Sequence, residues 1–376
     1  MTGKMGSRRP GPPRTGIATI GDVARKAGVS TATVSRAIAR PEMVSARTRE
    51  IVAAAVRAIG YEPGAAVRGG RPRSTGLVLA VIPRTGSPFF TPFLDAVSDL
   101  LSEAGLCVVV SDVLGSGKKE ANIARQLERA EFDGTILFTG RLPGGSRFGA
   151  NGIRTPLVLV CNDIPDLADV PVFDVANREA ARQMVQYLIS IGHRRIAHIR
   201  GPRGNIEAGE RLAGYSEALA AAGVAIEEDL VWDGDFYLGS GMAAAGRFLA
   251  CAERPTAVFS GNDQMAMGFI TELKHAGISV PGDLSVAGFD DLEFSAIFDP
   301  PLTTMHQPRA ELGRLAAVEL LQRLRGVGIE APPARVRLGC ELVIRSSTEH
   351  IRSPGNGVSA NPSKRRKRRA RPPARI

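Results

Sequence analysis

Residues 19–36 read TIGDVARKAGVSTATVSR, and this stretch decides the fold at the front of the chain. Thr19 can cap a helix, and from Ile20 to Ala27 the apolar residues follow the i, i+3, i+4, i+7 spacing of one helix face. Gly28 then ends that helix, because glycine is favoured just past a helix C-terminus. The first half of the stretch therefore predicts a short amphipathic helix with a defined stop.

A second helix begins after Ser30, which provides a new cap, and a third runs from near Ser45 to Gly60. Three short helices with a tight glycine turn between the first two are typical of a helix-turn-helix. In the second helix, apolar side chains are expected to face inward and short polar ones outward. The outward face carries Thr31, Ala32, Ser35 and Arg36.

Charge is unevenly distributed along the chain, whose formal net charge is +10. Residues 1–16 and 364–376 contain four and eight basic residues and no acidic ones, and residues 17–73 contain ten basic against four acidic. Residues 74–363 are acidic, with 26 basic against 34 acidic side chains. A basic front on an acidic body is expected of a DNA-binding head joined to a domain that need not touch DNA. We expect the basic C-terminal run to add nonspecific attraction to phosphates.

The length and composition of the chain limit the classes of protein to which it can belong. A chain of 376 residues that is 44% hydrophobic can fill two or three cores. It contains no apolar run of roughly eighteen residues, and residues 1–16 lack an apolar segment, which predicts a cytoplasmic protein without a membrane span or secretory signal. Buried, reduced thiols are expected for the four widely spaced cysteines, Cys107, Cys161, Cys251 and Cys340.

From Gly76 onward, short apolar runs alternate with longer amphipathic segments, which predicts β-α-β units around parallel sheets. Similar Ala-Gly helix stops at residues 104–105 and 222–223 indicate two subdomains built alike. Ligands of such sheets bind beyond the carboxyl ends of the strands, so two facing sheets form a cleft. The expected strands are Leu77–Ile82, Cys107–Ser111, Thr135–Phe138 and Leu157–Val160 in the first subdomain, and Arg195–Ile199, Leu230–Val231, Ala257–Ser260 and Ser285–Gly288 in the second.

The front of the chain resembles the DNA-binding head of the lactose and purine repressor (LacI/GalR) family over residues 19–36, 44–49 and 60–63, and the similarity continues to about residue 350. The resemblance implies an N-terminal all-α helix-turn-helix head plus an α/β periplasmic-binding-protein-like sensor of two subdomains. The matching stretches of the body include SPFF at 87–90, GHRRIA at 192–197, RLAGY at 211–215, NDQMAMG at 262–268, VPGDLSVAGFDD at 280–291 and PPLTTMHQP at 300–308.

The resemblance also implies that two heads of a homodimer bind operator DNA, each with its second helix in a major groove. Arg36 can donate two hydrogen bonds to a guanine edge, and Thr31 and Ala32 can contact bases. For the hydroxyls expected to bond phosphates, an ordinary capping role is the alternative. The predicted DNA-binding residues are Ser30, Thr31, Ala32, Thr33, Ser35, Arg36, Ser45, Thr48, Tyr61 and Val67.

Residues 63–73 occupy the place of the family's hinge helix, which wedges a leucine into the minor groove, but they read PGAAVRGGRPR. Gly64 replaces the usual capping asparagine, and Gly70 falls at the position of the leucine. Glycines weaken a helix by about 1 kcal/mol each, and glycine has no side chain to unstack bases. We therefore expect a poorly formed hinge and an altered DNA kink, unless a gap in the match gives the wedge role to Val67.

The family's body binds a small effector, so the resemblance implies effector-binding residues here. An arginine fork and a carboxylate suit vicinal hydroxyls, and aromatic rings suit sugar faces or bases. Cys161 stands where the family often has aspartate, so Asn162 or Asp163 is expected to substitute for it. The predicted effector-binding residues are Phe89, Phe90, Asn162, Arg211, Phe236, Asn262, Asp290 and Gln307.

The chemical class of the effector is less firmly indicated. VSTATVSR at 29–36, TGRLP at 139–143 and CELVIRSST at 340–348 are most similar to the cytidine-repressor branch of the family, which favours a nucleoside. A sugar is the alternative, because sugar-binding relatives use the same arginine, aspartate and phenylalanine positions. The sequence leaves open whether the effector releases or recruits DNA.

The sequence motifs that could indicate an enzyme are incomplete. Residues 115–119, GSGKK, lack the first glycine and the Mg²⁺-binding hydroxyl of a P-loop, and GSG at 239–241 is explained by a helix start. His193 and His306 have no nucleophile or metal ligand at suitable spacing, so structural roles are expected. We predict no catalytic residue, no metal and no cofactor.

Together these features predict a ligand-responsive, sequence-specific transcriptional regulator that acts as a homodimer, or a tetramer, and represses at an inverted-repeat operator. The alternative is a periplasmic-type sugar-binding protein or a sugar-metabolising enzyme, against which the basic head argues. The predicted segments are a disordered basic leader at 1–16, the helix-turn-helix domain at 17–62, a hinge linker at 63–75, the effector-binding and dimerisation domain at 76–350 and a disordered basic tail at 351–376.

Overall fold

The computed structural model describes residues 20–59, 74–113, 117–139, 155–164, 167–327 and 332–351. The chain divides into two compact units, Met1–Thr75 and Gly76–Ile376, which are described separately. The predicted leader, the hinge residues up to 73 and the tail from residue 352 lie outside the described residues, and so do Tyr61 and Val67.

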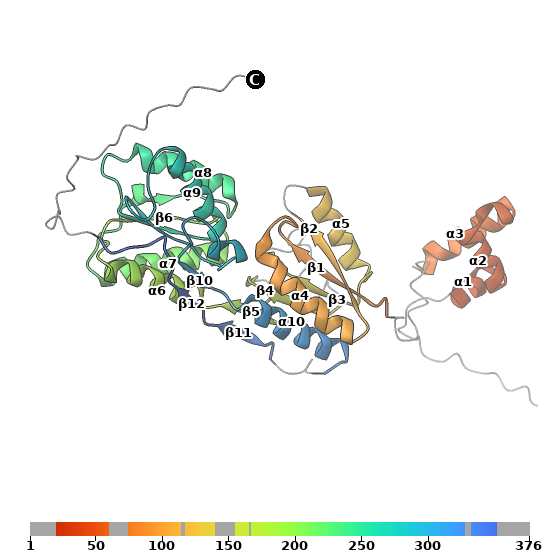
Figure 1. Ribbon diagram of the computed structural model, residues 1–376. Helices are drawn as coiled ribbons and strands as arrows, with labels where there is room; N and C mark the ends of the chain where they lie inside the picture. Colours follow the sequence, from red (N-terminus) through yellow and green to blue (C-terminus); the bar gives the residue numbers. More distant parts are fainter. Residues whose placement is uncertain are drawn as a thin grey trace, which may run out of the picture. The chain divides into compact units, whose positions relative to one another are not determined.

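The first unit is a small all-α bundle, as the sequence predicts (Figure 1). Its elements are α1 (Ile20–Ala27), α2 (Thr31–Ala39), the 3-10 turn η1 (Pro41–Met43) and α3 (Ala46–Ile59). Gly28 ends α1 with a φ of +67°, and the Val29 amide donates to the Ala24 carbonyl over 3.1 Å, which closes the helix end. Val34 and Val52 are fully or almost fully buried between the helices. The predicted helix-turn-helix is therefore confirmed.

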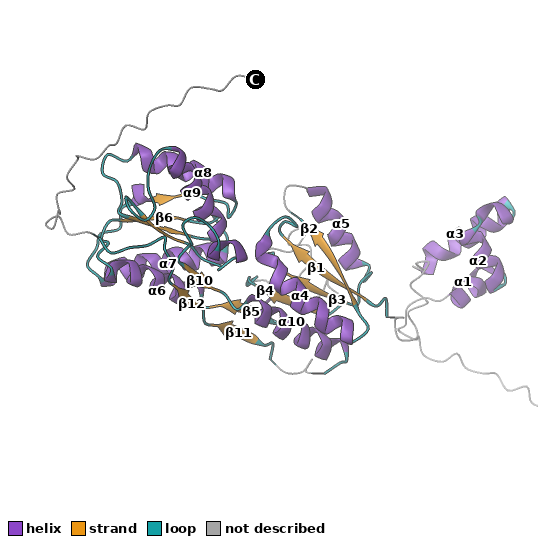
Figure 2. Cartoon of the chain, viewed as in Figure 1, coloured by secondary structure: helices purple, strands orange, loops and turns teal. Residues whose placement is uncertain are grey.

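The second unit contains two lobes, each with a parallel sheet between helices (Figure 2). The first lobe contains β1 (Leu77–Ile82), η3 (Pro88–Phe90), α4 (Thr91–Glu103), β2 (Cys107–Asp112), α5 (Gly117–Glu128), β3 (Gly134–Leu137), β4 (Leu157–Val160), β5 (Val172–Val175), α10 (Arg309–Leu324) and β11 (Arg335–Leu338). Its strand order is β11-β5-β4-β3-β1-β2, and every neighbouring pair is parallel. The sheet order places β1 in the interior, between β3 and edge strand β2, as its continuous apolar sequence requires.

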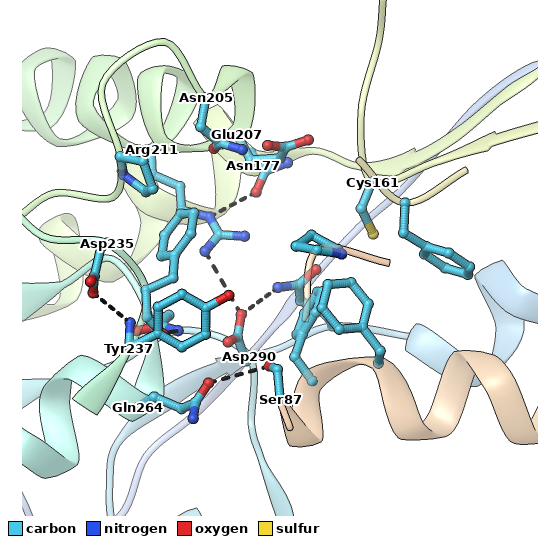
Figure 3. A pocket seen from close by; sticks show the side chains of 18 of the residues that line it. Ser87, Cys161, Asn177, Asn205, Glu207, Arg211, Asp235, Tyr237, Gln264 and Asp290 are labelled. Carbon is cyan, nitrogen blue, oxygen red and sulfur yellow. Dashed lines mark hydrogen bonds and ion pairs between the residues drawn. The ribbon is translucent and has the colours of Figure 1, made fainter. Parts of the chain in front are cut away.

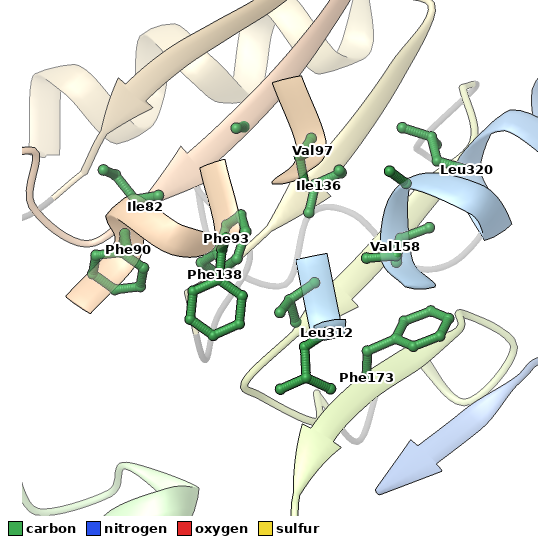
Figure 4. Packing of buried hydrophobic residues seen from close by; sticks show 14 of the residues in the cluster. Ile82, Phe90, Phe93, Val97, Ile136, Phe138, Val158, Phe173, Leu312 and Leu320 are labelled. Atoms are coloured by element: carbon green, nitrogen blue, oxygen red, sulfur yellow. The ribbon is translucent and has the colours of Figure 1, made fainter. Parts of the chain in front are cut away.

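The core of the first lobe follows from the alternation of side chains along β1. Val78, Ala80 and Ile82 pack in one hydrophobic cluster with residues of α4 and α10, whereas Leu79 and Val81 pack in another with residues of α5. Figure 4 shows the first of these clusters in close-up. Burial on both faces explains why this strand has no polar residue.

The second lobe repeats the same design. It contains α6 (Asn177–Ser190), β6 (Ile196–Ile199), α7 (Ile206–Ala221), η5 (Glu228–Leu230), β7 (Val231–Trp232), α8 (Leu238–Ala250), β8 (Ala257–Ser260), α9 (Asp263–His275), β9 (Ser285–Ala287), η6 (Glu293–Ala296), β10 (Thr304–His306) and β12 (Glu341–Val343). The parallel sheet has the order β7-β6-β8-β9, and β10 pairs antiparallel with β12. The chain passes between the lobes three times, at residues 175–177, 306–309 and 338–341. The predicted α/β body of two subdomains is confirmed.

The eight expected strands are present: three have the expected bounds, and the ends of the other five differ by one residue. Strands β5, β10, β11 and β12 were not expected. In β11, the exposed Arg335 and Arg337 alternate with apolar residues at a sheet edge instead of forming an apolar run. The expectation of buried thiols is wrong for Cys107, which is exposed at the start of edge strand β2, and Cys161, Cys251 and Cys340 are only partly buried. All four cysteine thiols are free. No helix in the described ranges combines the length and the apolarity needed to cross a bilayer.

The packing of α6 against α7 depends on Gly214, because a Cβ at this position would overlap the carbonyl oxygen of Arg178. We expect Gly214→Ala to lower the free energy of unfolding by about 1–3 kcal/mol through overpacking. Gly209→Ala is the matched control: Gly209 lies on the same helix, and a Cβ added there would have no neighbouring atom within 4 Å, so alanine should be neutral or mildly stabilising. Urea unfolding of both variants measures the difference, and equal stabilities would contradict this packing.

Candidate functional site

A cavity of about 200 Å³ lies between the two lobes of the second unit (Figure 3). The first lobe contributes a mostly apolar wall that includes Pro83, Phe89, Phe90 and Phe138. The second lobe contributes a polar wall from the ends of its strands and the start of α7. An apolar wall facing hydrogen-bonding groups is the usual composition of a small-molecule site.

Arg211 from α7 is the centre of the polar wall. Its Nε donates to Asn177 Oδ1 over 2.8 Å, and its Nη1 donates to the Gly261 carbonyl over 2.6 Å and lies 3.7 Å from Asp290 Oδ1. The guanidinium also lies over the ring of Phe289, 3.8 Å from the centroid. Because the residue is only 5% exposed, these contacts fix the orientation of a buried positive charge.

Asp290 follows β9 and is buried beside Arg211. Its Oδ1 accepts a hydrogen bond from Gln307 Nε2 over 2.7 Å. Burial raises the pKa of Asp290 to about 7, although Arg211 acts in the opposite direction. Asp290 and Asp291 have φ values of +124° and +53°, a left-handed conformation that costs a non-glycine residue about 1–3 kcal/mol. Such strain persists only where the surrounding structure holds it.

Asp263, the first residue of α9, holds this strained loop. Its carboxylate accepts from the Leu292 amide over 2.9 Å and from the hydroxyls of Ser295 and Thr304 over 2.6 Å each. Burial raises the pKa of Asp263 to about 6, against these hydrogen bonds. Gly288 packs so close that a Cβ there would overlap the same carboxylate. The loop that presents Asp290 is therefore rigidly supported.

Phe236 adds an aromatic ring to the polar wall. Its φ is +71°, and its ring packs on Gly201, where a Cβ would overlap it. Asn262 Nδ2 donates to the Phe236 carbonyl over 2.9 Å, and Asn262 Oδ1 accepts from the Met265 amide over 3.0 Å to cap α9. Asn262 lines the cavity, but both ends of its amide are already occupied.

Two further buried carboxyls line the cavity and were not predicted. Asp174 accepts from the Val175 amide over 2.7 Å, and burial raises its pKa to about 6. Burial and the charge of Asp174 raise the pKa of Glu207 to about 7. One sequence signal could have found Glu207: it precedes Arg211 by four residues and so shares its face of α7.

The structure brings together seven of the eight predicted effector residues around this cavity, and Asn162 is the exception. Asn162 is 1% exposed and donates to the carbonyls of Leu137 and Val160, while Cys161, with a φ of +55°, lines the cavity in its place. The seven residues that line it are Phe89, Phe90, Arg211, Phe236, Asn262, Asp290 and Gln307.

On the head, two of the predicted phosphate contacts also act as helix caps. Ser30 Oγ accepts from the Thr33 amide over 3.1 Å at the start of α2, and Ser45 Oγ accepts from the Thr48 amide over 3.2 Å at the start of α3. The hydroxyls of each pair are also hydrogen-bonded to one another. The α2 side chains predicted to face DNA are solvent-exposed, namely Thr31, Ala32, Ser35 and Arg36.

The two histidines noted in the sequence each have a side-chain hydrogen-bond partner, which fits a structural role. His193 Nδ1 lies 3.0 Å from Thr256 Oγ1, and His306 Nδ1 lies 3.0 Å from Asp291 Oδ2. The described ranges contain no group of three or more His, Cys, Asp or Glu side chains arranged to hold a metal ion.

Comparisons with known proteins agree with this architecture. Residues 19–64 match the lacI family of bacterial regulatory proteins, and residues 185–348 match the periplasmic binding protein-like domain. The chain is 35% identical over 334 residues to the HTH-type transcriptional repressor CytR of Escherichia coli K12, covering 89% of this chain and 97% of CytR. It is 33% identical over 335 residues to the repressor PurR of Vibrio campbellii, covering 89% and 100%. A solved transcriptional regulator CelR-cellobiose complex superimposes with a TM-score of 0.67 and 34% identity, covering 88% of this chain and 99% of CelR.

Fold and comparisons together define a DNA-binding transcriptional regulator with a helix-turn-helix head and a periplasmic-binding-protein-like body. The chain belongs to the lacI family of bacterial regulatory proteins. The prediction of a DNA-binding regulator is confirmed over the alternative of a periplasmic sugar-binding protein or a sugar-metabolising enzyme, and the relatives named above are transcriptional repressors or regulators.

The raised pKa of Glu207 predicts a pH-dependent cost to stability. The pKa of this carboxyl is about 4.5 in the unfolded chain and about 7 in the folded chain. Its contribution to the free energy of unfolding is therefore complete below pH 4.5 and is lost as the pH rises through 7. Without ligand, Glu207→Gln should therefore match the parent near pH 4.5 and exceed its free energy of unfolding by about 1–3 kcal/mol at pH 8. Urea unfolding across this range checks the prediction, and a difference that does not change with pH would contradict it.

Proposed function

We propose that the chain represses transcription as a homodimer at an inverted-repeat operator, and that a nucleoside or sugar in the interlobe cavity changes its affinity for that operator. The observation that carries this proposal is the cavity itself, where the buried Arg211 and Asp290 face a wall of phenylalanines. In this arrangement a polyhydroxylated or heterocyclic molecule can be hydrogen-bonded on one side and stacked on the other.

The exposed face of α2 supports the proposed reading of DNA bases. Arg36 is exposed and has no ion-pair partner among the described residues, so its guanidinium can make a bidentate contact to guanine. Thr31 and Ala32 lie at the N-terminal end of the same helix, where base contacts are made in helix-turn-helix proteins. Ser30, Thr33, Ser35, Ser45 and Thr48 would bond phosphates and fix the register on the duplex.

Two exposed apolar side chains of the body support homodimer formation. Phe294 in η6 is 54% exposed, and Ile297 just after it is 79% exposed. Large apolar side chains grouped on a surface favour association with another protein surface. In the proposed homodimer, a second copy of the chain covers them.

Contacts across the cavity explain how an effector would act. Ser87 Oγ lies 3.3 Å from Gln264 Oε1 (Figure 3). The Arg84 guanidinium lies over the ring of Tyr237, 4.6 Å from the centroid. Each contact joins the first lobe to the second. An effector that touches both walls stabilises the arrangement in which these contacts form. Differential affinity for two arrangements is the requirement for allosteric control, typically about 1–3 kcal/mol.

Different observations support each effector class. The similar CelR structure is a complex with cellobiose, which supports a sugar. The identity with CytR and the motif similarity to the cytidine-repressor branch support a nucleoside. We further propose that the protein acts in the cytoplasm and catalyses no reaction, which is supported by its similarity to repressors.

Replacing Arg36 tests the proposed DNA readout. Arg36→Ala should weaken binding to the preferred operator by about 1–3 kcal/mol, roughly 5- to 150-fold, while binding to unrelated duplexes changes little. The control is Arg57→Ala, in the last turn of α3, which should leave the ratio of specific to nonspecific affinity unchanged. Fluorescence anisotropy at fixed salt measures both affinities. An unchanged ratio for Arg36→Ala would falsify the assignment.

A further inference from the structure

Glu207 is a buried carboxyl for which the proposed function has given no role. It is 7% exposed, lines the cavity from the first turn of α7, and its Oε1 has no hydrogen-bond partner among the described residues. Figure 3 shows Glu207 in the group of side chains that line this cavity, with Arg211 and Asn177. An unpaired buried acceptor is costly, so a bound molecule that donates to it is favoured.

The cavity wall contains more carboxyls than its basic residue can neutralise. Asp174, Glu207, Asp235 and Asp290 line it, and Arg211 is the one lysine or arginine among its described lining residues. The guanidinium of Arg211 donates to Asn177 Oδ1 and to the Gly261 carbonyl, and among the described residues Asp290 has the carboxylate that lies within 4 Å of it. Above pH 7, where these carboxyls are ionised, Glu207 therefore lies in a region that attracts hydrogen-bond donors and repels anions.

We propose that Glu207 determines effector specificity, with its Oε1 accepting a hydrogen bond from a hydroxyl or amine of an uncharged or cationic effector. This inference rests on the proposed function, because it places the effector in the interlobe cavity. Phosphorylated or carboxylated compounds are disfavoured, since their charge would be buried among carboxyls in a poorly hydrated site. The donor can come from the hydroxyl of a carbohydrate or from the amine of a nucleobase.

Calorimetric titration of the full-length chain at pH 8, where the cavity carboxyls are ionised, tests the selectivity for charge. The compounds are cellobiose, ribose and cytidine, together with ribose 5-phosphate and cytidine 5′-monophosphate. We expect a neutral compound to bind at least tenfold more tightly than its phosphorylated counterpart. Tighter binding of either phosphorylated compound would overturn the inference.

Variants of Glu207 test its direct role. Glu207→Leu removes the acceptor and should weaken the neutral ligand at least tenfold, while an analogue that lacks the donor, such as N4,N4-dimethylcytidine in place of cytidine or a deoxy sugar in place of the sugar, is unaffected. Glu207→Gln keeps a carbonyl acceptor without the charge and should reduce the discrimination against phosphate. If Glu207→Leu folds poorly, Glu207→Gln decides: reduced discrimination against phosphate supports the inference, and unchanged discrimination would overturn it.

The matched control is Glu210→Gln, on the same helix, whose carboxylate is paired with Arg178 at 2.9 Å. It should leave every dissociation constant unchanged. Equal loss of all ligands in Glu207→Leu, or no loss of any, would overturn the inference, because Glu207 would then be structural or irrelevant. Operator binding is measured in parallel, to separate this result from a failure of the proposed function. The proposed function fails if the parent chain does not bind DNA, or if a bound ligand leaves its affinity for DNA unchanged.

Discussion

The buried guanidinium of Arg211 is the constraint on which the polar side of the cavity depends. A charge that is almost fully removed from water must be paired and hydrogen-bonded. Asn177, the Gly261 carbonyl and Asp290 meet this requirement. The position of Asp290 in turn depends on its left-handed backbone and on the hydrogen bonds by which Asp263 supports the loop. The arrangement fixes donors and acceptors in place before any ligand binds, which reduces the entropy lost on binding.

The same residues lie where the chain passes between the lobes. Asn177, the first residue of α6, lies in the first crossing, and Gln307 lies in the second. Both bind the Arg211–Asp290 pair, one through each partner. A ligand held by this pair therefore acts on the segments about which the lobes would move. Through these segments, a ligand in the cavity can change how the two lobes are arranged. In the proposed dimer, such a change would alter the spacing of the DNA-binding heads.

Much of the fold and of the candidate site could be predicted from the sequence. The head could be predicted because its short helices have clear caps, a glycine stop and regular apolar spacing. The strands could be predicted because parallel strands that are buried on both faces form apolar runs. Asn162 was misplaced because Cys161 adopts a left-handed conformation after β4, and the next side chain turns toward the interior. Asp174 and Glu207 come from β5 and the start of α7, and only the fold shows that both lie on one cavity.

Coupling between the cavity and the DNA-binding head is tested most directly by measuring operator affinity for the full-length chain with and without a saturating ligand identified by calorimetry. The expected result is a change of about 5- to 150-fold in the operator dissociation constant, absent in Arg211→Met. A ligand that binds in the cavity of the parent chain and leaves operator affinity unchanged would contradict the proposed regulation.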